Sequence, residues 1–208
     1  MIVTAGGTRE PIDEVRFIGN RSSGRMGFAV AQAALEEGAT VTLIAADTAA
    51  TPPLGVELVR VTTASEMQIE VEARLKSADV LVMAAAVADF RPKGPVSGKL
   101  DKSAGVPNIE LEPVPDILKA VAQVRTPSQT IVGFAAEHGN AVERAAGKMA
   151  TKGLDLMVCN DISDPTIGFE SEVNAVTILT PDSRTEIQTA PKIEIARKIV
   201  EAISRQRR

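Results

Sequence analysis

The chain has 208 residues, and its 44% hydrophobic and 24% charged content is typical of a folded globular protein. A formal net charge of −4 argues against a general nucleic-acid or anionic-membrane binder, because no overall positive field attracts phosphates. The lone cysteine, Cys159, and the lone histidine, His138, exclude an internal disulfide and a Cys/His zinc site, which leaves carboxylate-bound magnesium open.

Short runs rich in Val, Ile and Leu alternate along the chain with segments of helical periodicity. This alternation predicts an α/β fold, with a mostly parallel sheet and helices on both faces. In chain order, we expect a strand at 2–5, a helix at 24–37, strands at 41–46 and 56–61, a helix at 63–76, a strand at 80–85, a helix at 116–124, a strand at 130–135, a helix at 140–152 and a strand at 156–160. A strand at 173–179, a partner for it at 185–188 and a helix that begins at Pro191 complete the order.

Two connections, at 6–23 and 87–108, are too long for a minimal repeat of strands and helices. Structureless connections of this length inside a compact domain are usually functional or disordered. We therefore expect a flexible active-site loop at about 87–108. With no internal repeat or linker in view, we expect one domain over residues 1–208.

The first predicted strand runs directly into Gly6-Gly7-Thr8, at the carboxyl end where open α/β sheets place their ligands. The spacing matches neither the G-x-G-x-x-G dinucleotide fingerprint nor the G-x-x-x-x-G-K-[ST] phosphate loop. An NAD-type oxidoreductase is therefore disfavoured. A plain tight turn explains the two glycines equally well.

The first predicted helix follows a polar segment that contains Asn20, Ser22 and Ser23, and its first turn holds Gly24 and Gly27. Hydroxyl groups and glycines at the positive end of a helix suit a phosphate or another anion. Ordinary N-capping by either serine is the alternative. The amide of Asn20 and the arginines nearby favour a binding site.

The strand predicted at 80–85 ends in Met83-Ala84-Ala85, and Asp89 follows it. Small side chains there would let a flat ligand lie against backbone amides, and Asp89 could hold a ribose, a substrate amide or a magnesium ion. A tightly packed crossing with Asp89 as a turn cap is an equally good interpretation.

Basic residues mark two further segments. Arg91, Lys93, Lys99 and Lys102 lie in a stretch rich in glycine and proline with one acid, Asp101, which favours either a mobile phosphate clamp or a solvated loop. Lys148 and Lys152 are four residues apart, and therefore lie on one face of the predicted helix. By themselves, these two are typical of surface lysines.

Phe134 and Asn160 lie near the ends of the strands predicted at 130–135 and 156–160. Phe134 is typical of a core residue and Asn160 of a turn former, unless they face a ligand.

Six segments match, in the same order and with similar separations, those of one enzyme family. They are TAGGTREPIDEVRFIGNRSSGRMG, VMAAAVADFRP, GKL-DK, VPDIL, VGFAAE and K-x-x-x-K-x-x-D-x-x-VCND. From Ile2 to about Leu179, the chain resembles bacterial phosphopantothenoylcysteine synthetase. The resemblance implies a Rossmann-like sheet, a homodimer and a dimerisation region at about 161–190, where the strand at 173–179 could pair between subunits.

The family joins cysteine to 4′-phosphopantothenate in coenzyme A synthesis. In bacterial members, the substrate carboxylate attacks the α-phosphate of CTP to form an acyl-cytidylate and pyrophosphate, and the cysteine amine then displaces CMP. The resemblance therefore implies CTP, 4′-phosphopantothenate and cysteine as partners and Mg²⁺ as the cofactor, with the metal-binding residues unknown. A non-catalytic nucleotide- or flavin-binding module is the alternative function.

The resemblance also implies roles for individual residues. Asn20 corresponds to the active-site Asn of the family, Lys99 to its loop lysine, and Asp89 to a ribose or substrate contact, and we expect these three to be catalytic. The other implied nucleotide- or substrate-binding positions are Gly6, Ser22, Gly24, Gly27, Met83, Ala84, Ala85, Pro115, Asp116, Ile117, Leu118, Phe134, Lys148, Lys152 and Asn160.

In many bacteria, this synthetase is fused to a flavin-dependent decarboxylase, and the resemblance implies such a fusion or association. Because Met1 directly precedes the first predicted strand, we expect no flavin in this chain. The residues after Met1 lack the basic and then apolar pattern of a leader, so we expect a cytoplasmic protein with no nucleic-acid or membrane partner.

Overall fold

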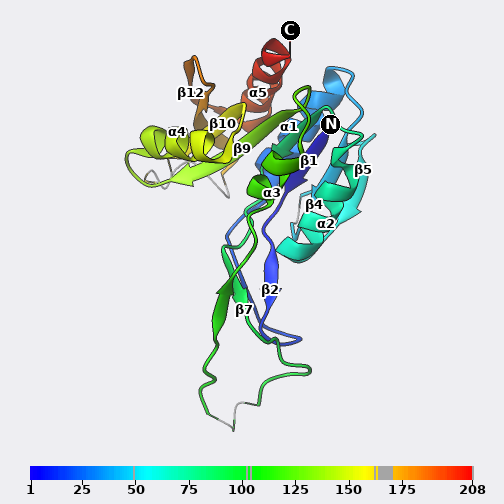
Figure 1. The fold of residues 1–208 in the computed structure, drawn as a ribbon, viewed down its shortest axis with the longest axis vertical. Helices are drawn as coiled ribbons and strands as arrows, with labels where there is room; N and C mark the ends of the chain where they lie inside the picture. The colour runs from blue at the N-terminus through cyan, green and yellow to red at the C-terminus, as the bar shows by residue number, and fades with distance from the viewer. Residues whose placement is uncertain (49, 102, 104, 162, 164–170, 208) are drawn as a thin grey trace.

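The apolar runs of the sequence form one eight-stranded sheet in the computed structural model, which describes residues 1–48, 50–101, 103, 105–161, 163 and 171–207 (Figure 1). Its strands are β1 (Ile2–Ala5), β4 (Thr42–Ala45), β5 (Glu57–Arg60), β6 (Val80–Met83), β9 (Thr130–Glu137), β10 (Leu156–Asp161), β11 (Val173–Leu179) and β12 (Arg184–Pro191). They lie in the order β5-β4-β1-β6-β9-β10-β11-β12. Only β11 and β12 are antiparallel to their neighbours, so the predicted α/β fold with a mostly parallel sheet is confirmed.

Helices cover both faces of this sheet, as expected. Helices α1 (Arg25–Glu36) and α5 (Lys192–Gln206) pack together on one face, while α2 (Ala64–Leu75), α3 (Ile117–Val124) and α4 (Ala141–Lys152) cover the other. Successive strand side chains point to opposite faces. Within β1, Val3 therefore belongs to the core under α1 and α5, and Ile2 to the core under α2, α3 and α4. The central strands are apolar at successive positions because their side chains contribute alternately to the two hydrophobic cores.

The centre of the sheet is a point where the strand order reverses. β1 and β6 are neighbours, yet the chain continues from β1 towards β4 on one side and from β6 towards β9 on the other. Connections that leave in opposite directions keep a crevice open beyond the carboxyl ends of the two strands. At this point the backbone N–H of Ala86 donates to the carbonyl oxygen of Gly6 (2.8 Å) and joins the two connections.

The two long connections fold together into an arm that projects from the head (Figure 1). The first connection contains β2 (Arg9–Pro11) and β3 (Phe17–Gly19), the second contains β7 (Phe90–Pro92), and β8 (Leu111–Pro113) follows it. The periodicity predicted none of these four short strands. β2 pairs with β3, and β7 pairs with β8, both in antiparallel ribbons. The flexible active-site loop expected at about 87–108 includes β7, and its residues Lys102 and Ala104 lie outside the described part of the chain, so the loop's flexibility stays a prediction. Strands of three residues are too short for an alternation to be recognised.

Asp13 holds the two halves of the arm together. Its carboxylate accepts hydrogen bonds from the backbone N–H groups of Val15 (2.8 Å), Arg16 (2.7 Å) and Leu100 (3.1 Å), and from the guanidinium of Arg16. Burial alone would raise the pKa of Asp13, but the three N–H donors and Arg16 outweigh it and hold the pKa below the ordinary value. The charged carboxylate therefore stabilises the arm.

The base of the arm is attached to the head through Glu10. This glutamate is almost fully buried, and its carboxylate accepts a hydrogen bond from the backbone N–H of Ala64 at the start of α2 (2.9 Å). Helix α2 itself begins with a capping box between Thr63 and Glu66. The arm thus begins from a fixed point on the head.

The predicted dimerisation region at 161–190 contains two described strands. β11 pairs with β10 on one side and with β12 on the other, so its backbone has no edge to offer to a second copy. The edge strand is β12, and residues 164–170 lie outside the described part of the chain. Within this chain both edges of β11 are occupied, and a dimerisation region at about 161–190 stays a prediction.

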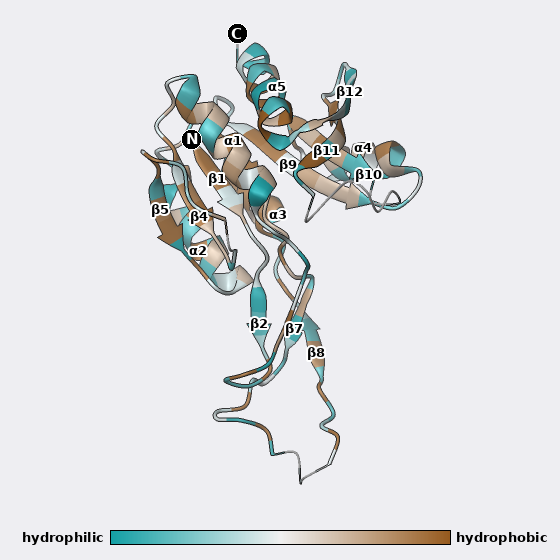
Figure 2. Cartoon of the chain, turned by 180° about the vertical axis from the view of Figure 1, so that it is seen from behind, coloured by the Kyte–Doolittle hydropathy of each residue, from teal (hydrophilic) through white to brown (hydrophobic). Residues whose placement is uncertain are grey.

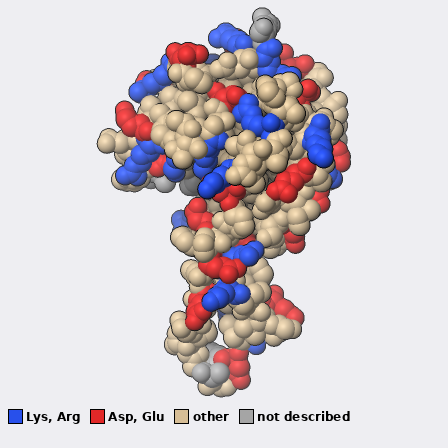
Figure 3. Space-filling view, in the orientation of Figure 1, with Lys and Arg blue, Asp and Glu red and all other residues tan. Residues whose placement is uncertain are grey.

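Hydrophobic residues concentrate in the sheet and on the inner sides of the helices, whereas β2 in the arm is hydrophilic (Figure 2). On the face drawn in Figure 3, acidic and basic side chains are interspersed over the head and along the arm. Among the described residues, no helix is both long enough and apolar enough to cross a bilayer.

Replacing Asp13 by Ala should loosen the arm while the head stays folded, because three backbone N–H groups lose their acceptor. We expect trypsin to cut at Arg16 or Lys99 about tenfold faster, with little change in the thermal unfolding of the head. In the wild type, the same loosening should appear as the pH falls below about 3.8, since a carboxylate with a lowered pKa stabilises the fold only while it is charged. Equal cleavage rates in the two proteins would contradict this role.

Candidate functional site

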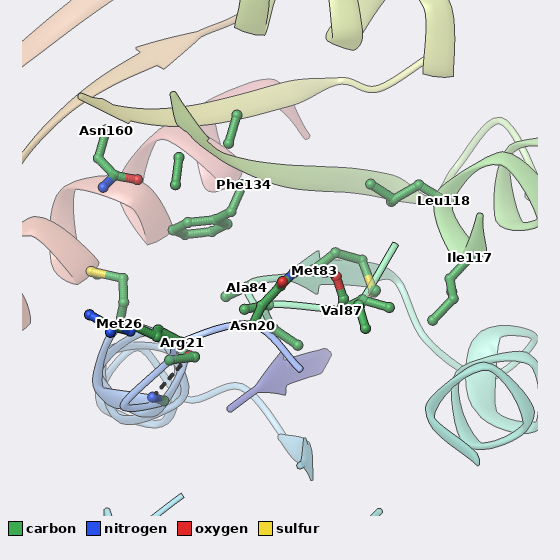
Figure 4. A pocket seen from close by; sticks show the side chains of 18 of the residues that line it. Asn20, Arg21, Met26, Met83, Ala84, Val87, Ile117, Leu118, Phe134 and Asn160 are labelled. Atoms are coloured by element: carbon green, nitrogen blue, oxygen red, sulfur yellow. Dashed lines mark hydrogen bonds between the residues drawn. The ribbon is translucent and has the colours of Figure 1, made fainter. Parts of the chain in front are cut away.

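A pocket with a volume of about 680 Å³ opens at the carboxyl ends of the central strands, where the strand order reverses (Figure 4). It is elongated. Asn160, Met26 and Arg21 lie at one end, Ile117 and Leu118 lie at the other, and Asn20, Met83 and Ala84 lie between them. Among the described residues, five basic ones line it (Arg21, Arg25, Lys148, Lys152 and Lys192), against two acidic ones (Asp89 and Asp116). The pocket is therefore a locally positive site in a chain of net charge −4.

The first turn of α1 forms one wall of the pocket. Its N-cap is Gly24, in the left-handed conformation (φ 73°), and no described side chain caps the helix. The hydroxyl of Ser22 instead accepts a hydrogen bond from the N–H of Gly24 itself (3.2 Å). The capping alternative that the sequence left open is thus not what the structure shows. The first turn of α1 lines the pocket, and the positive end of a helix suits an anion.

Gly27 allows this helix to lie close to β1. A Cβ atom at Gly27 would stand 2.8 Å from the carbonyl oxygen of Thr4 and 2.7 Å from the Cβ of Ala5. Both neighbours belong to the central strand, so neither can easily move. The glycine thereby sets the position of the helix N-terminus relative to the strand ends.

Asn20 connects the two long connections at the mouth of the pocket. Its side-chain amide donates a hydrogen bond to the carbonyl oxygen of Val87 (2.8 Å). Close by, the N–H of Ala88 donates to the hydroxyl of Thr8 (2.9 Å). The amide of Asn20 is therefore held in a defined orientation by the backbone of the connection that follows β6.

The wall after β6 is built from backbone and small side chains. Ala84, Ala85 and Ala86 line the pocket here, and the N–H of Ala85 is held by the hydroxyl of Thr4 (3.1 Å). In Figure 4, the ring of Phe134 lies between Asn160 and Ala84. A flat group could lie along this alanine wall beside an aromatic ring, which agrees with the flat-ligand interpretation of this segment.

Two lysines on α4 line the other end of the pocket, and each is paired with a carboxylate. Lys148 contacts Glu137, which is almost fully buried at the end of β9 (2.5 Å), and Lys152 contacts Asp116 (2.8 Å). Burial raises the pKa of Asp116, but the ammonium of Lys152 and the N–H of Lys119 outweigh it and hold the pKa below its ordinary value. Asp116 also serves as the N-cap of α3. These pairs fix the lysines in place and neutralise much of their charge.

Cys159 is a buried structural residue. Its thiol donates a hydrogen bond to the carbonyl oxygen of Ala141 (3.3 Å). Burial, followed by the charges of Glu137 and Asp161, raises the pKa of this thiol to about 11. A thiol so difficult to ionise is unsuited to act as a nucleophile.

Most of the residues named from the sequence meet in this pocket. Asn20, Ser22, Gly24, Gly27, Met83, Ala84, Ala85, Asp89, Pro115, Asp116, Ile117, Leu118, Phe134, Lys148, Lys152 and Asn160 all line it. Gly6 and Lys99 do not. Gly6 is buried beneath it, where a Cβ would meet the backbone of Ala46, and Lys99 is exposed on the arm, next to the contact between Leu100 and Asp13.

Arg25, Asn174, Val176 and Lys192 also line the pocket, although no motif predicted them there. Asn174 and Val176 flank an irregularity in the pairing of β11 with β12. Bulges of this kind redirect side chains and are frequent beside functional sites, but a single sequence does not reveal them. Lys192 is the first residue of α5, and Pro191 before it marks the start of a helix but does not indicate that the lysine reaches the pocket.

The described residues contain no cluster of three or more His, Cys, Asp or Glu side chains that could enclose a metal ion. Magnesium, however, is usually held by one or two carboxylates together with substrate phosphates. Asp89 fits that mode, because it lines the pocket and makes no ion pair with another described residue, whereas Asp116 is paired with Lys152.

Comparison with known proteins finds relatives that match nearly the whole chain. A family model described as the DNA/pantothenate metabolism flavoprotein C-terminal domain matches residues 1–206. The chain is 46% identical over 215 residues to the coenzyme A biosynthesis bifunctional protein CoaBC of Mycobacterium tuberculosis (strain ATCC 25618 / H37Rv), which covers 98% of this chain and 51% of the relative. It is 40% identical to the CoaBC of Vibrio parahaemolyticus, covering 97% and 51%, respectively. The chain thus spans about half the length of the curated relatives it matches.

One solved structure matches over nearly the whole fold. It is the crystal structure of the C-terminal domain of a coenzyme A biosynthesis bifunctional protein CoaBC, with 39% sequence identity and a TM-score of 0.82. The match covers 97% of this chain and 92% of that one. The arm and the head described above therefore belong to a fold already seen in crystals.

Replacing Gly27 by Ala should push α1 away from β1 and destabilise the protein by about 1–3 kcal/mol, because the new methyl group overlaps the strand. Gly147 offers a matched control on α4, where a Cβ would meet nothing within 4 Å. There, Ala should stabilise the protein by about 0.5–1 kcal/mol, since alanine favours helix over glycine. Urea unfolding of both variants tests this, and equal changes would show that Gly27 does not set the packing of α1.

Proposed function

Because the chain belongs to the family of DNA/pantothenate metabolism flavoprotein C-terminal domains, we propose that it is a phosphopantothenate–cysteine ligase of coenzyme A biosynthesis that uses CTP. The observation that supports this most is the pocket itself. It combines an uncapped helix N-terminus, a wall of backbone amides, a fixed Asn20 amide and an excess of basic residues.

In the proposed first step, a carboxylate oxygen of 4′-phosphopantothenate attacks the α-phosphorus of CTP. A new P–O bond forms, the bond to the β-phosphate oxygen breaks, and pyrophosphate leaves. The reacting groups are all negatively charged, so the main task of the protein is to hold fixed positive groups around them. The first turn of α1 and the basic residues of the pocket are suited to that task.

In the second step, the cysteine amine attacks the acyl carbon, the bond to the CMP oxygen breaks, and the amine loses a proton. The acyl oxygen gains negative charge as the amine adds. The amide of Asn20, already held by Val87, is suited to donate a hydrogen bond to that oxygen. Such a donor lowers the barrier because it needs no rearrangement during the reaction.

Magnesium, when bound, would neutralise charge on the CTP phosphates, and Asp89 is the pocket carboxylate suited to hold it with them. Asp116 is less suited, because it is the N-cap of α3 and the partner of Lys152. Lys99 is exposed on the arm and does not line the pocket of this chain, and its proposed contact with the ligand follows from the resemblance.

We extend the proposal to a homodimer formed through the arm. Phe90 and Pro92 share one face of the β7–β8 ribbon with Leu111 and Pro113, because paired residues and residues two apart point to the same side. The opposite face carries the ion pair between Arg91 and Glu112 (2.8 Å). Phe90 is 54% exposed and Leu111 is 49% exposed in this chain. An apolar face of this kind is suited to be covered by a second copy.

The remaining expectations belong to the same proposal. The partners would be CTP, 4′-phosphopantothenate and cysteine, in the cytoplasm, with a flavin-dependent decarboxylase fused or associated. The names of the bifunctional relatives, of which this chain spans about half, support that association.

The activity can be tested by pyrophosphate release with CTP, ATP, GTP and UTP, with and without 4′-phosphopantothenate and cysteine. We expect release with CTP once phosphopantothenate is present. Lys99→Gln should slow this release about tenfold or more, and Asn20→Asp should slow the second step about a hundredfold, so that mass spectrometry detects an accumulated acyl-cytidylate. Lys76→Gln, at an exposed position after α2, is the control and should change neither step.

Binding of CTP without any pyrophosphate release would instead favour a non-catalytic nucleotide-binding module. Full turnover by both Asn20→Asp and Lys99→Gln would remove these residues from the mechanism.

The dimer can be tested by light scattering of the double variant Phe90→Ser/Leu111→Ser. We expect the wild type to have twice the mass of one chain and the double variant to dissociate at least about tenfold more readily, since two apolar contacts are lost. Ile69→Ser is a matched control, because Ile69 is 63% exposed on α2, away from the arm. A monomeric wild type, or equal effects of the two changes, would contradict the arm interface.

A further inference from the structure

Thr8 is a fully buried residue to which the proposed mechanism gives no role. It lies just past the end of β1, where the first long connection leaves the sheet, and it is 0% exposed and does not line the pocket. Its hydroxyl accepts a hydrogen bond from the N–H of Ala88 (2.9 Å). A buried N–H without an acceptor is unfavourable, so the structure of the second long connection depends on this hydroxyl.

The hydroxyl of Thr8 continues the pairing of the two connections beyond the end of their backbone ladder. The N–H of Ala86 donates to the carbonyl oxygen of Gly6 (2.8 Å), and the N–H of Thr8 donates to the carbonyl oxygen of Ala86 (3.2 Å). In a parallel ladder, the next bond would run from the N–H of Ala88 to the carbonyl oxygen of Thr8. The side-chain oxygen of Thr8 takes the place of that carbonyl.

The carbonyl of Thr8 is directed elsewhere because the chain turns into the arm at this residue. Arg9, the next residue, begins β2 and pairs with Gly19 on β3. A Cβ atom at Gly19 would stand 2.5 Å from the carbonyl oxygen of Thr8, so this oxygen lies against Gly19. The N–H of Ala88 therefore needs a side-chain acceptor at position 8.

The peptide group that Thr8 holds also binds the amide of Asn20. The carbonyl of Val87 and the N–H of Ala88 belong to one planar peptide unit. Thr8 accepts from its N–H, and the amide of Asn20 donates to its carbonyl oxygen (2.8 Å) at the mouth of the pocket (Figure 4). Because the unit is planar, a rotation at one end moves the other. The hydroxyl of Thr8 thus fixes the carbonyl that Asn20 contacts.

This carbonyl determines which way the amide of Asn20 faces. A carbonyl oxygen only accepts hydrogen bonds, so it selects the NH₂ group of the amide over its oxygen. One N–H is used by Val87, and the second is left for a ligand. Asn20 is exposed, and water competes for both N–H groups, so its orientation depends on a carbonyl that does not move. Its backbone is also closely packed, since a Cβ at Gly7 would stand 2.5 Å from the carbonyl oxygen of Asn20.

We propose that Thr8 is a positioning residue for Asn20. Its buried hydroxyl holds the peptide between Val87 and Ala88, so that the amide of Asn20 presents an N–H to the acyl oxygen when the cysteine amine attacks. The inference rests on the proposed function, because it assigns Thr8 to the second step of that reaction. Thr8 acts through the peptide and Asn20, since it does not line the pocket itself.

The kinetic test compares the two steps in Thr8→Val, which keeps the shape of the side chain and removes the acceptor. We expect the second step, followed as decay of the acyl-cytidylate by mass spectrometry of quenched single turnovers, to slow about tenfold, because a misplaced donor stabilises the acyl oxygen less. Pyrophosphate release in the first step should stay within about twofold of the wild type. Thr8→Ser restores the hydroxyl and should return the second step to within about threefold of the wild type.

Thr63→Val is a matched control for the loss of a threonine acceptor. The hydroxyl of Thr63 also accepts a backbone N–H, that of Glu66 at the start of α2 (3.2 Å), and Thr63 does not line the pocket. This variant should lower the stability of the protein and leave both steps unchanged.

A double variant tests whether Thr8 acts through Asn20. Asn20→Ala has no amide to orient, so adding Thr8→Val to it should slow the second step by less than about twofold further. If the two residues acted independently, the second change would cost its full tenfold.

NMR of the protein without ligand tests the orientation of Asn20 separately from catalysis. In the wild type, we expect the N–H of Ala88 to exchange with solvent at least about a hundredfold more slowly than an unprotected amide. In Thr8→Val, this exchange should become at least about tenfold faster, and the side-chain NH₂ signals of Asn20 should shift towards those of a free asparagine. Thr8→Ser should keep both properties of the wild type.

Unprotected exchange at Ala88 in the wild type would overturn the inference, even if Thr8→Val does not fold. Unchanged Asn20 signals in Thr8→Val, equal slowing of both steps, or a full further loss in the Asn20→Ala background would overturn it as well. A wild type that releases no pyrophosphate would count against the proposed function, whereas the NMR signals would still decide whether Thr8 orients Asn20.

Discussion

The reversal of strand order between β1 and β6 is the constraint on which the rest of the molecule depends. It separates the connections that leave these two strands, and the crevice between them becomes the pocket. Hydrogen bonds between the two connections, from Ala86 to Gly6 and from Asn20 to Val87, limit how far apart the connections lie. The site is therefore rigid where its walls are backbone, and its chemistry depends on the few side chains that reach over the strand ends.

The charge of this pocket depends on which basic side chains are paired with carboxylates as well as on how many basic side chains line it. The lysines of α4 are held by carboxylates on β9 and at the start of α3, which fixes their positions and reduces their field. At α1, close packing fixes the position of the helix, because Gly27 and Gly24 allow its first turn to lie against the end of β1 and the residues near it. No described side chain caps this helix. An acidic chain can thus present a positive cavity, because the basic groups concentrate where the sheet places them.

Sequence patterns predict the head better than the arm. The parallel strands are recognisable because burial on both faces demands continuous apolar runs, and the capping box at Thr63 marks α2. Each strand in the two ribbons of the arm has only three residues, which is too short for an alternation of apolar and polar residues to be recognised. Within the site, motif segments predict most of the lining, whereas Asn174 and Lys192 reach the pocket through a strand irregularity and a helix start, which depend on tertiary packing. The opposite holds for Lys99, because a recognisable motif predicts it in the site, whereas it does not line the pocket in the described fold.

The arm is made from two pieces of chain that are separated by about seventy residues, and neither piece could be shortened independently. Removing β2 and β3 would take away Glu10, which attaches the arm to α2, and Asp13, which holds the backbone at Leu100. Removing β7 and β8 would leave the first piece without the backbone that it contacts at Val96. Insertions and deletions during evolution should therefore occur in both pieces together, as compensating changes in length.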